Sequence, residues 1–485
     1  MVYIIGTGPG DEELLTLKAV NTLKKCTAVL YDRLISNNIF NYLSEECETY
    51  YCGKAPGSHY MTQDQINKLM IDLAKAGHVV GRIKGGDPFV FGRGSEEALA
   101  LMEEGINFEI IPGVTSPVAV LEYSGIPITH RNIARSFHII SGMSTGKLNI
   151  DFENLAKCEG TLVFMMGLSN LELIVDRLKS FGKNENTQVA VVMKGTTSKQ
   201  KKVIGTLSDI VQKVNEEKLE SPCIIAVGDV VKFSEKLEWV SKKPLFGKNI
   251  CITRAKHQSE DLKRKLWDLG AEVTQINSIK IETQNQNLDS YIEKLEKYDF
   301  AIFTSTNAVD IFFDYLIEKK YDIRRLKAKF VAIGEVTQNA ILKRGIVPFL
   351  VSQIANKEEL FQKLRPFLFF DQNVVIPTSE KANNYLTEKL KSMGLNVDRI
   401  NIYNTLQGKV INKNSFDYVD IVFFSSTSTV DNMVNLFGTE KIRTKQVYAI
   451  GPKTYNLLEK YNIESKICKK CTEDGFIEEL MNNLK

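Results

Sequence analysis

The second half of this 485-residue chain contains one sequence pattern twice. Segments that begin at Asn249 and Asn373 align without gaps, and each reads as a strand, a helix, a glycine and a second strand. Two further pairs of matching segments begin at Phe303 and Phe424 and at Ala332 and Ala449. Because alternating strands and helices favour parallel sheets, the duplication predicts two similar α/β lobes with a cleft between them.

Each copy also places serine and threonine residues at a strand end, just before a helix. Free backbone N–H groups and the helix dipole attract anions at such positions. The same side chains are common N-caps, and a capping hydroxyl leaves the neighbouring amides available. We therefore interpret four residues both as caps and as candidates for binding a polyanion: Ser305, Thr306, Ser426 and Thr427.

The first half begins with an apolar strand that leads into a glycine loop. Val2–Ile5 reads as a buried strand, and Gly6-Thr-Gly-Pro-Gly-Asp follows it. A helix is expected next, with Asp11 as its N-cap, acids in the first turn where the dipole favours them, and one apolar face. That face consists of Leu14, Leu17, Val20 and Leu23.

The next strand, residues 28–31, ends at Asp32. Strand, glycine loop, helix, strand and acid is also the order of a dinucleotide-binding unit. That fingerprint needs a third glycine three residues after the second, whereas this loop has glycines at 6, 8 and 10, and Pro9 lacks an N–H for a pyrophosphate. A nicotinamide enzyme is therefore the disfavoured alternative.

Residues 82–97 join a glycine pair to a carboxylate, a turn and several basic side chains. Gly85 and Gly86 let the backbone approach a ligand closely, and Asp87 places a carboxylate at a turn. A surface turn with salt-bridged arginines is the simpler interpretation of such a stretch. Together with the glycine loop at residues 6–11, it favours a site for a small charged ligand.

Several motifs of the first half follow the order of a known family. Over nearly all of residues 1–240 they resemble the uroporphyrinogen III C-methyltransferases, at residues 6–16, 31–36, 82–97, 112–116, 125–131, 165–167 and 227–231. The resemblance implies a two-lobed tetrapyrrole methyltransferase fold. It also implies transfer of two methyl groups from S-adenosylmethionine to uroporphyrinogen III, giving precorrin-2 for sirohaem or corrinoid synthesis.

The same resemblance assigns site residues. Asp32 matches the base and Lys54 the proton donor, although outside the motif Asp32 would be interpreted as an acid paired with Arg33. Contacts to S-adenosylmethionine fall on Pro9, Gly85, Gly86, Asp87, Val90, Thr115, Ser116, Met166 and Gly195. Four basic residues are candidates either for the substrate's carboxylates or for structural ion pairs: Arg82, Lys84, Arg93 and Arg131.

Residues 245–485 resemble uroporphyrinogen III synthase, beginning with Thr253-Arg254. The implied reaction cyclises hydroxymethylbilane, inverts the last pyrrole ring and releases a hydroxyl, mainly by positioning the substrate and with no metal or redox cofactor. Tyr403 matches the favoured proton source. Substrate contacts fall on Thr253, Arg254, Ser305, Thr306, Ser426, Thr427 and Thr454.

A polar link at residues 241–248 separates the two halves. We expect a methyltransferase domain at 1–243 and a synthase domain at 244–485. The expected synthase lobes are residues 247–282 with 405–485, and residues 283–404. The methyltransferase family suggests a homodimer through the first half, and the fusion of consecutive steps favours direct use of uroporphyrinogen III.

Composition limits the other possibilities. With 43% hydrophobic and 25% charged residues and a net charge of +3, the chain is expected to be soluble and cytoplasmic, with no basic stripe for nucleic acid, no membrane-spanning run and no signal peptide. Cys468 and Cys471 are spaced like a metal or redox pair, but an isolated pair favours an incidental spacing, and no metal is predicted. One alternative remains for the second half, namely a module that binds a tetrapyrrole without transforming it.

Overall fold

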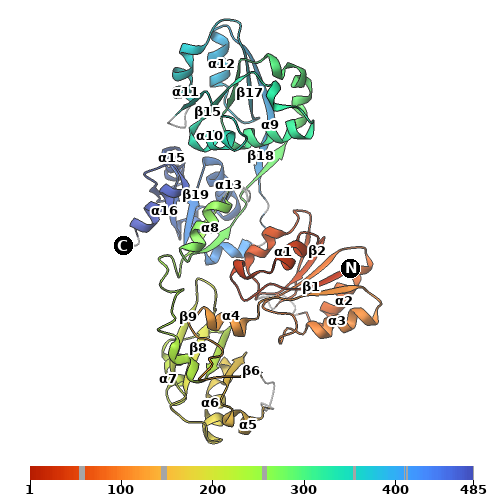
Figure 1. Ribbon diagram of the computed structural model, residues 1–485, viewed down its shortest axis with the longest axis vertical. Helices are drawn as coiled ribbons and strands as arrows, with labels where there is room; N and C mark the ends of the chain where they lie inside the picture. The colour runs from red at the N-terminus through yellow and green to blue at the C-terminus, as the bar shows by residue number, and fades with distance from the viewer. Residues whose placement is uncertain are drawn as a thin grey trace. The chain divides into compact units, whose positions relative to one another are not determined.

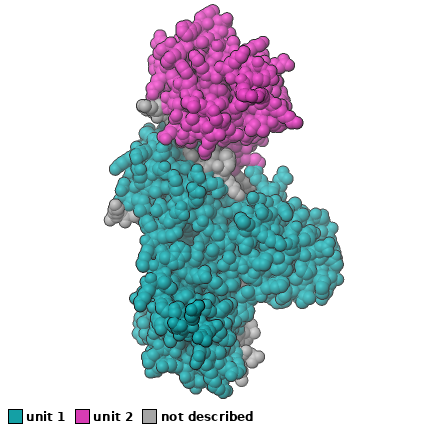
Figure 2. Space-filling model, in the orientation of Figure 1, with its two compact units in different colours: residues 1–277, 409–485 teal, residues 278–408 magenta. Residues whose placement is uncertain are grey.

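The computed structural model describes residues 1–53, 61–143, 150–253, 259–352, 357–408, 410 and 413–483. Within these ranges the chain forms four sheets with helices packed around them (Figure 1). It divides into two compact units, residues 1–277 with 409–485 and residues 278–408 (Figure 2). None of the described helices is both long and apolar enough to cross a membrane.

The first sheet has five parallel strands in the order β3-β2-β4-β1-β5. Helices cover both of its faces, so consecutive strand residues are buried. Ile4 packs against α2 and α3, whereas its neighbour Ile5 packs against α1. The elements are β1 (Val2–Gly6), α1 (Leu17–Leu23), β2 (Ala28–Tyr31), β3 (Glu48–Tyr51), α2 (Gln63–Lys75), β4 (Val80–Lys84), α3 (Gly94–Glu103), β5 (Phe108–Ile111) and α4 (Ser116–Glu122).

The single helix expected after the glycine loop is instead two short helices. Asp11 caps a 3-10 helix, η1 (Glu12–Leu14), and the chain becomes extended before Thr16 caps α1. The Thr16 hydroxyl accepts a backbone N–H in the first turn of α1 and so starts a new helix with its own phase. Leu17 is consequently 83% exposed, and its expected place on a buried apolar face is wrong.

The second sheet is mixed, in the order β6-β7-β10-β8-β9. Because β10 is antiparallel to both β7 and β8, those two strands run in the same direction and end at the same edge. The elements are β6 (Phe137–Ser141), α5 (Phe152–Lys157), β7 (Thr161–Met165), η3 (Leu168–Asn170), α6 (Leu171–Ser180), β8 (Gln188–Met193), β9 (Lys201–Thr206), α7 (Ile210–Glu216), β10 (Cys223–Val227) and η4 (Asp229–Phe233).

The third sheet, also in the larger unit, is entirely parallel, in the order β12-β11-β19-β20-β21. Its first two strands come from residues near 250–275, and the other three return from the end of the chain. The elements are β11 (Asn249–Ile252), α8 (Glu260–Asp268), β12 (Glu272–Gln275), η9 (Lys413–Tyr418), β19 (Ile421–Phe424), α13 (Thr427–Phe437), α14 (Thr439–Arg443), β20 (Gln446–Ala449), α15 (Pro452–Lys460), β21 (Lys466–Ile467) and α16 (Glu473–Asn482).

The smaller unit contains the fourth sheet, in the order β13-β18-β17-β14-β15-β16, parallel except for β13. The elements are β13 (Ile279–Thr283), η6 (Asn285–Lys297), β14 (Phe300–Phe303), α9 (Thr306–Glu318), η7 (Ile323–Arg325), β15 (Lys329–Ile333), α10 (Gly334–Leu342), β16 (Leu350–Ser352), α11 (Lys357–Leu364), η8 (Arg365–Phe367), β17 (Asn373–Ser379), α12 (Tyr385–Ser392) and β18 (Asn396–Gln407).

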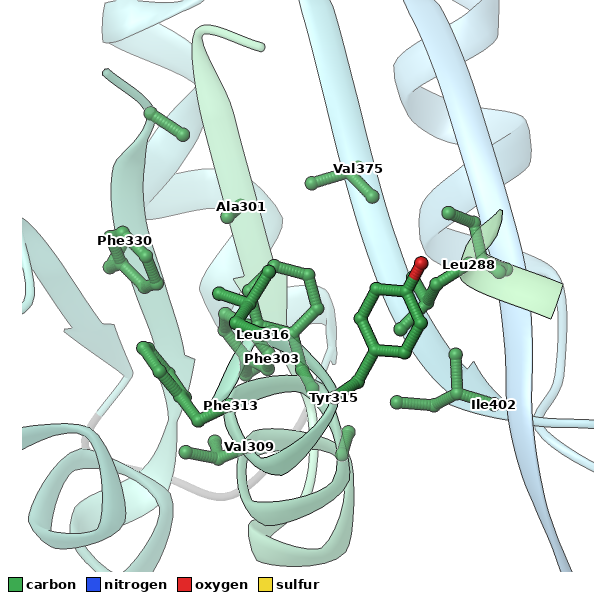
Figure 3. Packing of buried hydrophobic residues seen from close by; sticks show 14 of the residues in the cluster. Leu288, Ala301, Phe303, Val309, Phe313, Tyr315, Leu316, Phe330, Val375 and Ile402 are labelled. Atoms are coloured by element: carbon green, nitrogen blue, oxygen red, sulfur yellow. The ribbon is translucent and has the colours of Figure 1, made fainter. Parts of the chain in front are cut away.

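An aromatic core holds the smaller unit together (Figure 3). The Phe303 and Phe330 rings are stacked and nearly parallel, with centroids 5.8 Å apart, and Phe313 from α9 stacks on both. Aromatic rings bury large areas, so this cluster fixes α9 and its preceding loop against the sheet.

The third and fourth sheets repeat one design. Asn249 pairs with Glu272, and Asn373 pairs with Asn396, so the two copies share the same register. The glycine that follows the helix, Gly270 or Gly394, has a positive φ in both copies. When β17 and β18 are matched to β11 and β12 and β13 is set aside, both sheets have the doubly wound strand order 2-1-3-4-5. The predicted duplication of an α/β lobe is confirmed.

Candidate functional site

The loops singled out in the first half meet at one edge of the first sheet. Strands β1, β2, β4 and β5 are parallel, so the segments that follow them lie at the same edge. Since β1 lies between β4 and β5 in the sheet, the glycine loop leaves at the point where strand order reverses. Doubly wound sheets bind ligands at such points. The segments are residues 7–11, 32–36, 85–93 and 112–116.

Three of these loops touch through their backbones. Gly8 and Gly86 form an antiparallel bridge, with Gly86 N donating to Gly8 O at 2.6 Å and Gly8 N to Gly86 O at 3.2 Å. A Cβ added to Gly113 would lie 2.2 Å from Gly86 O, and one on Gly6 would lie 2.6 Å from Gly113 N. Only glycine allows this approach, and it leaves the edge lined with backbone groups.

Asp87 fastens two of the loops together. Its Oδ1 accepts the Phe89 N–H at 2.8 Å, and its Oδ2 accepts the Gly113 N–H at 3.1 Å. A carboxylate has about four lone-pair positions, so each oxygen can accept another donor. The expected bond between Asp87 and a ligand ammonium stays a prediction. The two bonds to backbone N–H groups show that Asp87 also fixes the shape of the loop.

Asp32 lies at the same edge and is connected to a buried charge network. Its side chain is 28% exposed, and its Oδ2 is 3.7 Å from Arg82 Nη2. Arg82 Nε donates to Glu97 Oε1 at 2.9 Å, and Lys84 Nζ donates to the same oxygen at 3.0 Å. Glu97, from α3, is completely buried. Asp32 also accepts the Leu34 N–H, which fixes its carboxylate at the strand exit.

This network bears on the two roles that the sequence left open for its basic residues. Arg82 and Lys84 were candidates for substrate contacts, but their side chains are only 5% and 6% exposed and are engaged by Glu97. Burial and the neighbouring Arg82 cation lower the pKa of Lys84. Burial opposes the charge of Arg82 as well, but Glu97 and Asp32 raise its pKa overall. Of the two roles considered, the geometry supports the structural one.

The other two basic candidates are accessible. Arg93 has a left-handed backbone, φ 58°, and forms a two-bond ion pair with Glu96 in which the side chains are 53% and 51% exposed. Arg131 is also exposed. Both therefore remain predicted substrate contacts.

The second sheet supplies the remaining expected cofactor residues. Met166 and Gly195 follow β7 and β8 at one edge, and a Cβ on Gly195 would lie 2.4 Å from Val120 in α4. The Thr196 hydroxyl accepts the Asp11 N–H at 3.2 Å, so the loop that follows β8 of the second sheet contacts the glycine loop of the first sheet. Pro9, Val90, Thr115 and Ser116 are half-buried at the first sheet's edge.

The sequence interpretation missed the exposed apolar side chains of this region. Phe89, Phe91 and Leu34 are 56%, 46% and 52% exposed, and Leu34 O would lie 2.9 Å from a Cβ on Gly85. Exposed apolar groups gathered next to a polar loop are typical of a ligand-binding surface. The two phenylalanines inside a glycine-rich loop were the available signal.

In the third sheet, four of the expected synthase residues follow neighbouring strands. The Thr253 hydroxyl donates to Phe423 O at 3.0 Å, and the Ser426 hydroxyl accepts the Thr429 N–H as the cap of α13. Thr454 is buried in the first turn of α15. Because the strands are parallel, the residues that follow them, including Thr427, lie at one edge of the sheet.

In the fourth sheet, the side chain of Tyr403 on β18 contacts Ser305, in the loop that follows β14. Tyr403 is buried, and its Oη lies 2.9 Å from Ser305 Oγ. Ser305 also accepts the Ala308 N–H, so it caps α9 while it holds the phenol. Thr306 follows as the first residue of α9. Lys54 and Arg254 lie outside the described residues.

The cysteine pair follows β21 at this edge of the third sheet, and a Cβ added to Gly451, the cap of α15, would lie 2.7 Å from Cys471 Sγ. Cys468 is buried and Cys471 is exposed. Burial, with Glu479 and Cys471 nearby, raises the pKa of Cys468 to about 12, so its thiol is protonated at neutral pH.

Comparison with known proteins identifies each half. Residues 1–211 match the family model of tetrapyrrole (corrin/porphyrin) methylases, and residues 260–478 match that of uroporphyrinogen-III synthase HemD. The fold and these matches define a tetrapyrrole methylase joined to a uroporphyrinogen-III synthase fold.

Individual relatives cover different shares of the chain. The porphyrin biosynthesis protein HemD of Ruminiclostridium josui is 36% identical over 99% of this chain and 97% of that protein. A uroporphyrinogen-III C-methyltransferase of Bacillus subtilis is 41% identical over 74% of each. A crystal structure of uroporphyrin III C-methyltransferase from Thermus thermophilus is 37% identical and covers 48% of this chain and 98% of that one, with a TM-score of 0.42. The chain belongs to the family of HemD-type porphyrin biosynthesis proteins that carry an N-terminal tetrapyrrole methylase.

Proposed function

We propose that this chain is a bifunctional enzyme of tetrapyrrole biosynthesis. Its second half cyclises hydroxymethylbilane to uroporphyrinogen III, and its first half transfers two methyl groups from S-adenosylmethionine to that product, giving precorrin-2. The observation that carries the proposal is the convergence of Asp32, the glycine loop and Gly85-Gly86-Asp87 at one sheet edge, in a chain whose relatives span both halves.

Methyl transfer needs alignment more than activation, because a sulfonium is already a good methyl donor. In the proposal, the close approach of the backbones at Gly8, Gly86 and Gly113 shapes the cofactor site, and the carboxylate of Asp87 is available to the cofactor's ammonium. Thr115, Ser116, Met166 and Gly195 complete the cofactor contacts, and the rim of Leu34, Phe89 and Phe91 receives the macrocycle.

The acceptor carbon must also lose a proton. Asp32 is the proposed base because it is partly exposed at the same edge and is held by the Leu34 N–H and by Arg82. Arg82 is itself fixed by Glu97, so the carboxylate has a supported orientation. Lys54 is the proposed proton donor. Arg93 and Arg131 are the proposed partners of the substrate's carboxylates.

For the cyclisation, the hydroxyls and backbone amides at the helix starts of the duplicated lobes are the proposed partners of the substrate's carboxylates. The phenol of Tyr403 donates the proton that lets the terminal hydroxyl leave as water, and Ser305 Oγ orients the phenol.

The proposal also includes a boundary between the two domains at residues 243 and 244 and a homodimer through the first half. Sedimentation velocity of the full chain tests the dimer.

An Asp32→Asn variant of the full chain tests the assignment. The amide keeps the shape of the carboxylate but cannot accept the proton, so precorrin-2 formation is expected to fall by about 10²–10⁴-fold. Cyclisation of hydroxymethylbilane is expected to continue at the wild-type rate. Retention of methylation would remove Asp32 as the base, and loss of both activities would contradict separate sites.

A further inference from the structure

A buried ion pair joins the glycine loop of the methyltransferase half to the synthase half. Glu12, the first residue of η1, accepts a hydrogen bond from Lys263 Nζ at 2.6 Å, and Lys263 lies on α8. Both side chains are only 2% exposed. Tyr42 Oη donates to the same Glu12 oxygen at 2.6 Å, and the Lys263 ammonium lies 4.6 Å from the centre of the Trp267 ring.

Other polar contacts surround the pair. Asn38 donates to Val273 O and accepts the Gln275 N–H, so its amide bonds two backbone groups of β12. Glu272 Oε2 accepts the Ser198 N–H at 2.8 Å. These bonds are specific in geometry and join segments more than 70 residues apart in the sequence. The region is therefore a built junction within the larger unit.

The ion pair lies very close to the proposed cofactor loop. Glu12 directly follows Asp11, and a Cβ on Gly10 would meet Thr197 at 2.8 Å, so the loop is confined on that side. Two residues earlier, Gly8 forms its bridge with Gly86. The segment from Gly8 to Glu12 is therefore held at one end by the cofactor edge and at the other by Lys263.

Packing alone does not hold the outer end of this segment. A cavity of about 240 Å³ borders it, lined in part by Glu12, Glu13, Trp239 and Trp267. The second carboxylate oxygen of Glu12 is buried and has no hydrogen-bond partner among the described residues. A buried carboxylate beside a cavity depends on its paired charge, so Lys263, together with the Tyr42 hydroxyl, constrains Glu12.

We propose that Lys263 of the synthase half is a positioning residue for the methyltransferase's cofactor loop. The inference rests on the proposed function, because it takes residues 6–11 as part of the S-adenosylmethionine site. Lys263 acts through Glu12 and does not itself touch the cofactor. By linkage, cofactor binding that orders the loop also stabilises α8 of the synthase half, because coupling between two sites is reciprocal.

The test uses the full chain and S-adenosylhomocysteine, the demethylated product, as the probe. Lys263→Met keeps the length and apolar stem of the side chain and removes its charge. Lys265→Met is the matched control, because Lys265 lies on the same helix but pairs with Asp474 and is 44% exposed. Lys263→Met is expected to raise the Kd for S-adenosylhomocysteine by about 2–30-fold, and Lys265→Met to leave it unchanged.

Hydrogen exchange supplies a readout that general destabilisation would not give. In the wild-type chain, S-adenosylhomocysteine is expected to slow amide exchange in residues 260–268, and this slowing is expected to be absent in Lys263→Met and present in Lys265→Met. An unchanged exchange rate in these residues of the wild type, or equal Kd values for the two variants, overturns the proposal. Because the wild-type measurement needs no substitution, it decides the matter even where Lys263→Met does not fold. A wild-type chain that does not bind the probe would instead refute the proposed function.

Discussion

Glu97→Gln is the most informative perturbation of the methyltransferase half. The substitution keeps the size of the side chain but removes the only charge that both Arg82 and Lys84 contact directly in the described part of the chain. All three side chains are at least 94% buried. Removing one partner of a buried ion pair costs about 3–5 kcal/mol, because the remaining charges stay desolvated without compensation.

This loss is large enough to measure by thermal unfolding. For a domain of 150–250 residues, 1 kcal/mol shifts the Tm by about 2–4 °C, so Glu97→Gln is expected to lower the Tm of the methyltransferase half by about 6–20 °C. Glu96→Gln is the matched control, one residue earlier on α3 and in an exposed pair with Arg93. Such pairs contribute little, so its Tm is expected to stay close to that of the wild type.

The pH dependence gives a second signature. The pKa of Lys84 is lowered in the folded state, so folding releases protons, and stability contributed by this group rises with pH between the lowered folded value and the unfolded value of about 10.4. Loss of Glu97 removes a carboxylate that opposes the lowering and widens that window. The Tm deficit of Glu97→Gln is therefore expected to be largest near pH 7 and to shrink towards pH 10. Equal Tm values for the Glu96 and Glu97 variants, or a deficit that grows with pH, would refute the account of this network.

Two further predictions concern the proposed sites. Gly113→Ala places a Cβ 2.2 Å from Gly86 O and is expected to abolish binding of S-adenosylhomocysteine, measured by calorimetry. Gly105→Ala is the control: Gly105 has φ +66° and a Cβ there would have no atom within 4 Å, so the variant is expected to lose about 1–2 kcal/mol of stability but to bind normally. Equal binding by both variants would contradict the loop packing. Tyr403→Phe is expected to slow hydroxymethylbilane cyclisation by about 10²-fold or more and to leave methylation unchanged. Ser305→Ala is expected to slow cyclisation much less. A cyclisation rate of Tyr403→Phe close to that of the wild type would leave Tyr403 only a structural role.

The fold was largely predictable because its signals are periodic and local. The duplicated strand, helix and glycine pattern near Asn249 and Asn373 predicts two lobes, and the structure gives both the same register. The division of the first helix was not predictable from apolar spacing, because Thr16 provides a second cap that restarts the helix. Local capping there prevails over the apolar pattern.

The site was predictable only where backbone geometry depends on residue type. Glycine loops and a carboxylate after a strand indicate their positions directly, since parallel strands end at one edge. The pairing of charges carries no such signal: the sequence leaves Arg82 and Lys84 open between substrate contacts and ion pairs, and the structure shows Glu97 beside them. Glu12 was expected only as an acid that the helix dipole favours. Its ion pair with Lys263, 251 residues away, cannot be predicted from the local sequence.

The most direct test of the central claim supplies purified full-length protein with hydroxymethylbilane, with and without S-adenosylmethionine, and identifies the products by absorbance and isomer analysis. The proposed function predicts uroporphyrinogen III without the cofactor and precorrin-2 with it. Formation of uroporphyrinogen I alone would contradict the synthase activity and favour a second half that only binds tetrapyrroles. Accumulation of uroporphyrinogen III without precorrin-2 in the presence of S-adenosylmethionine would contradict the methyltransferase activity.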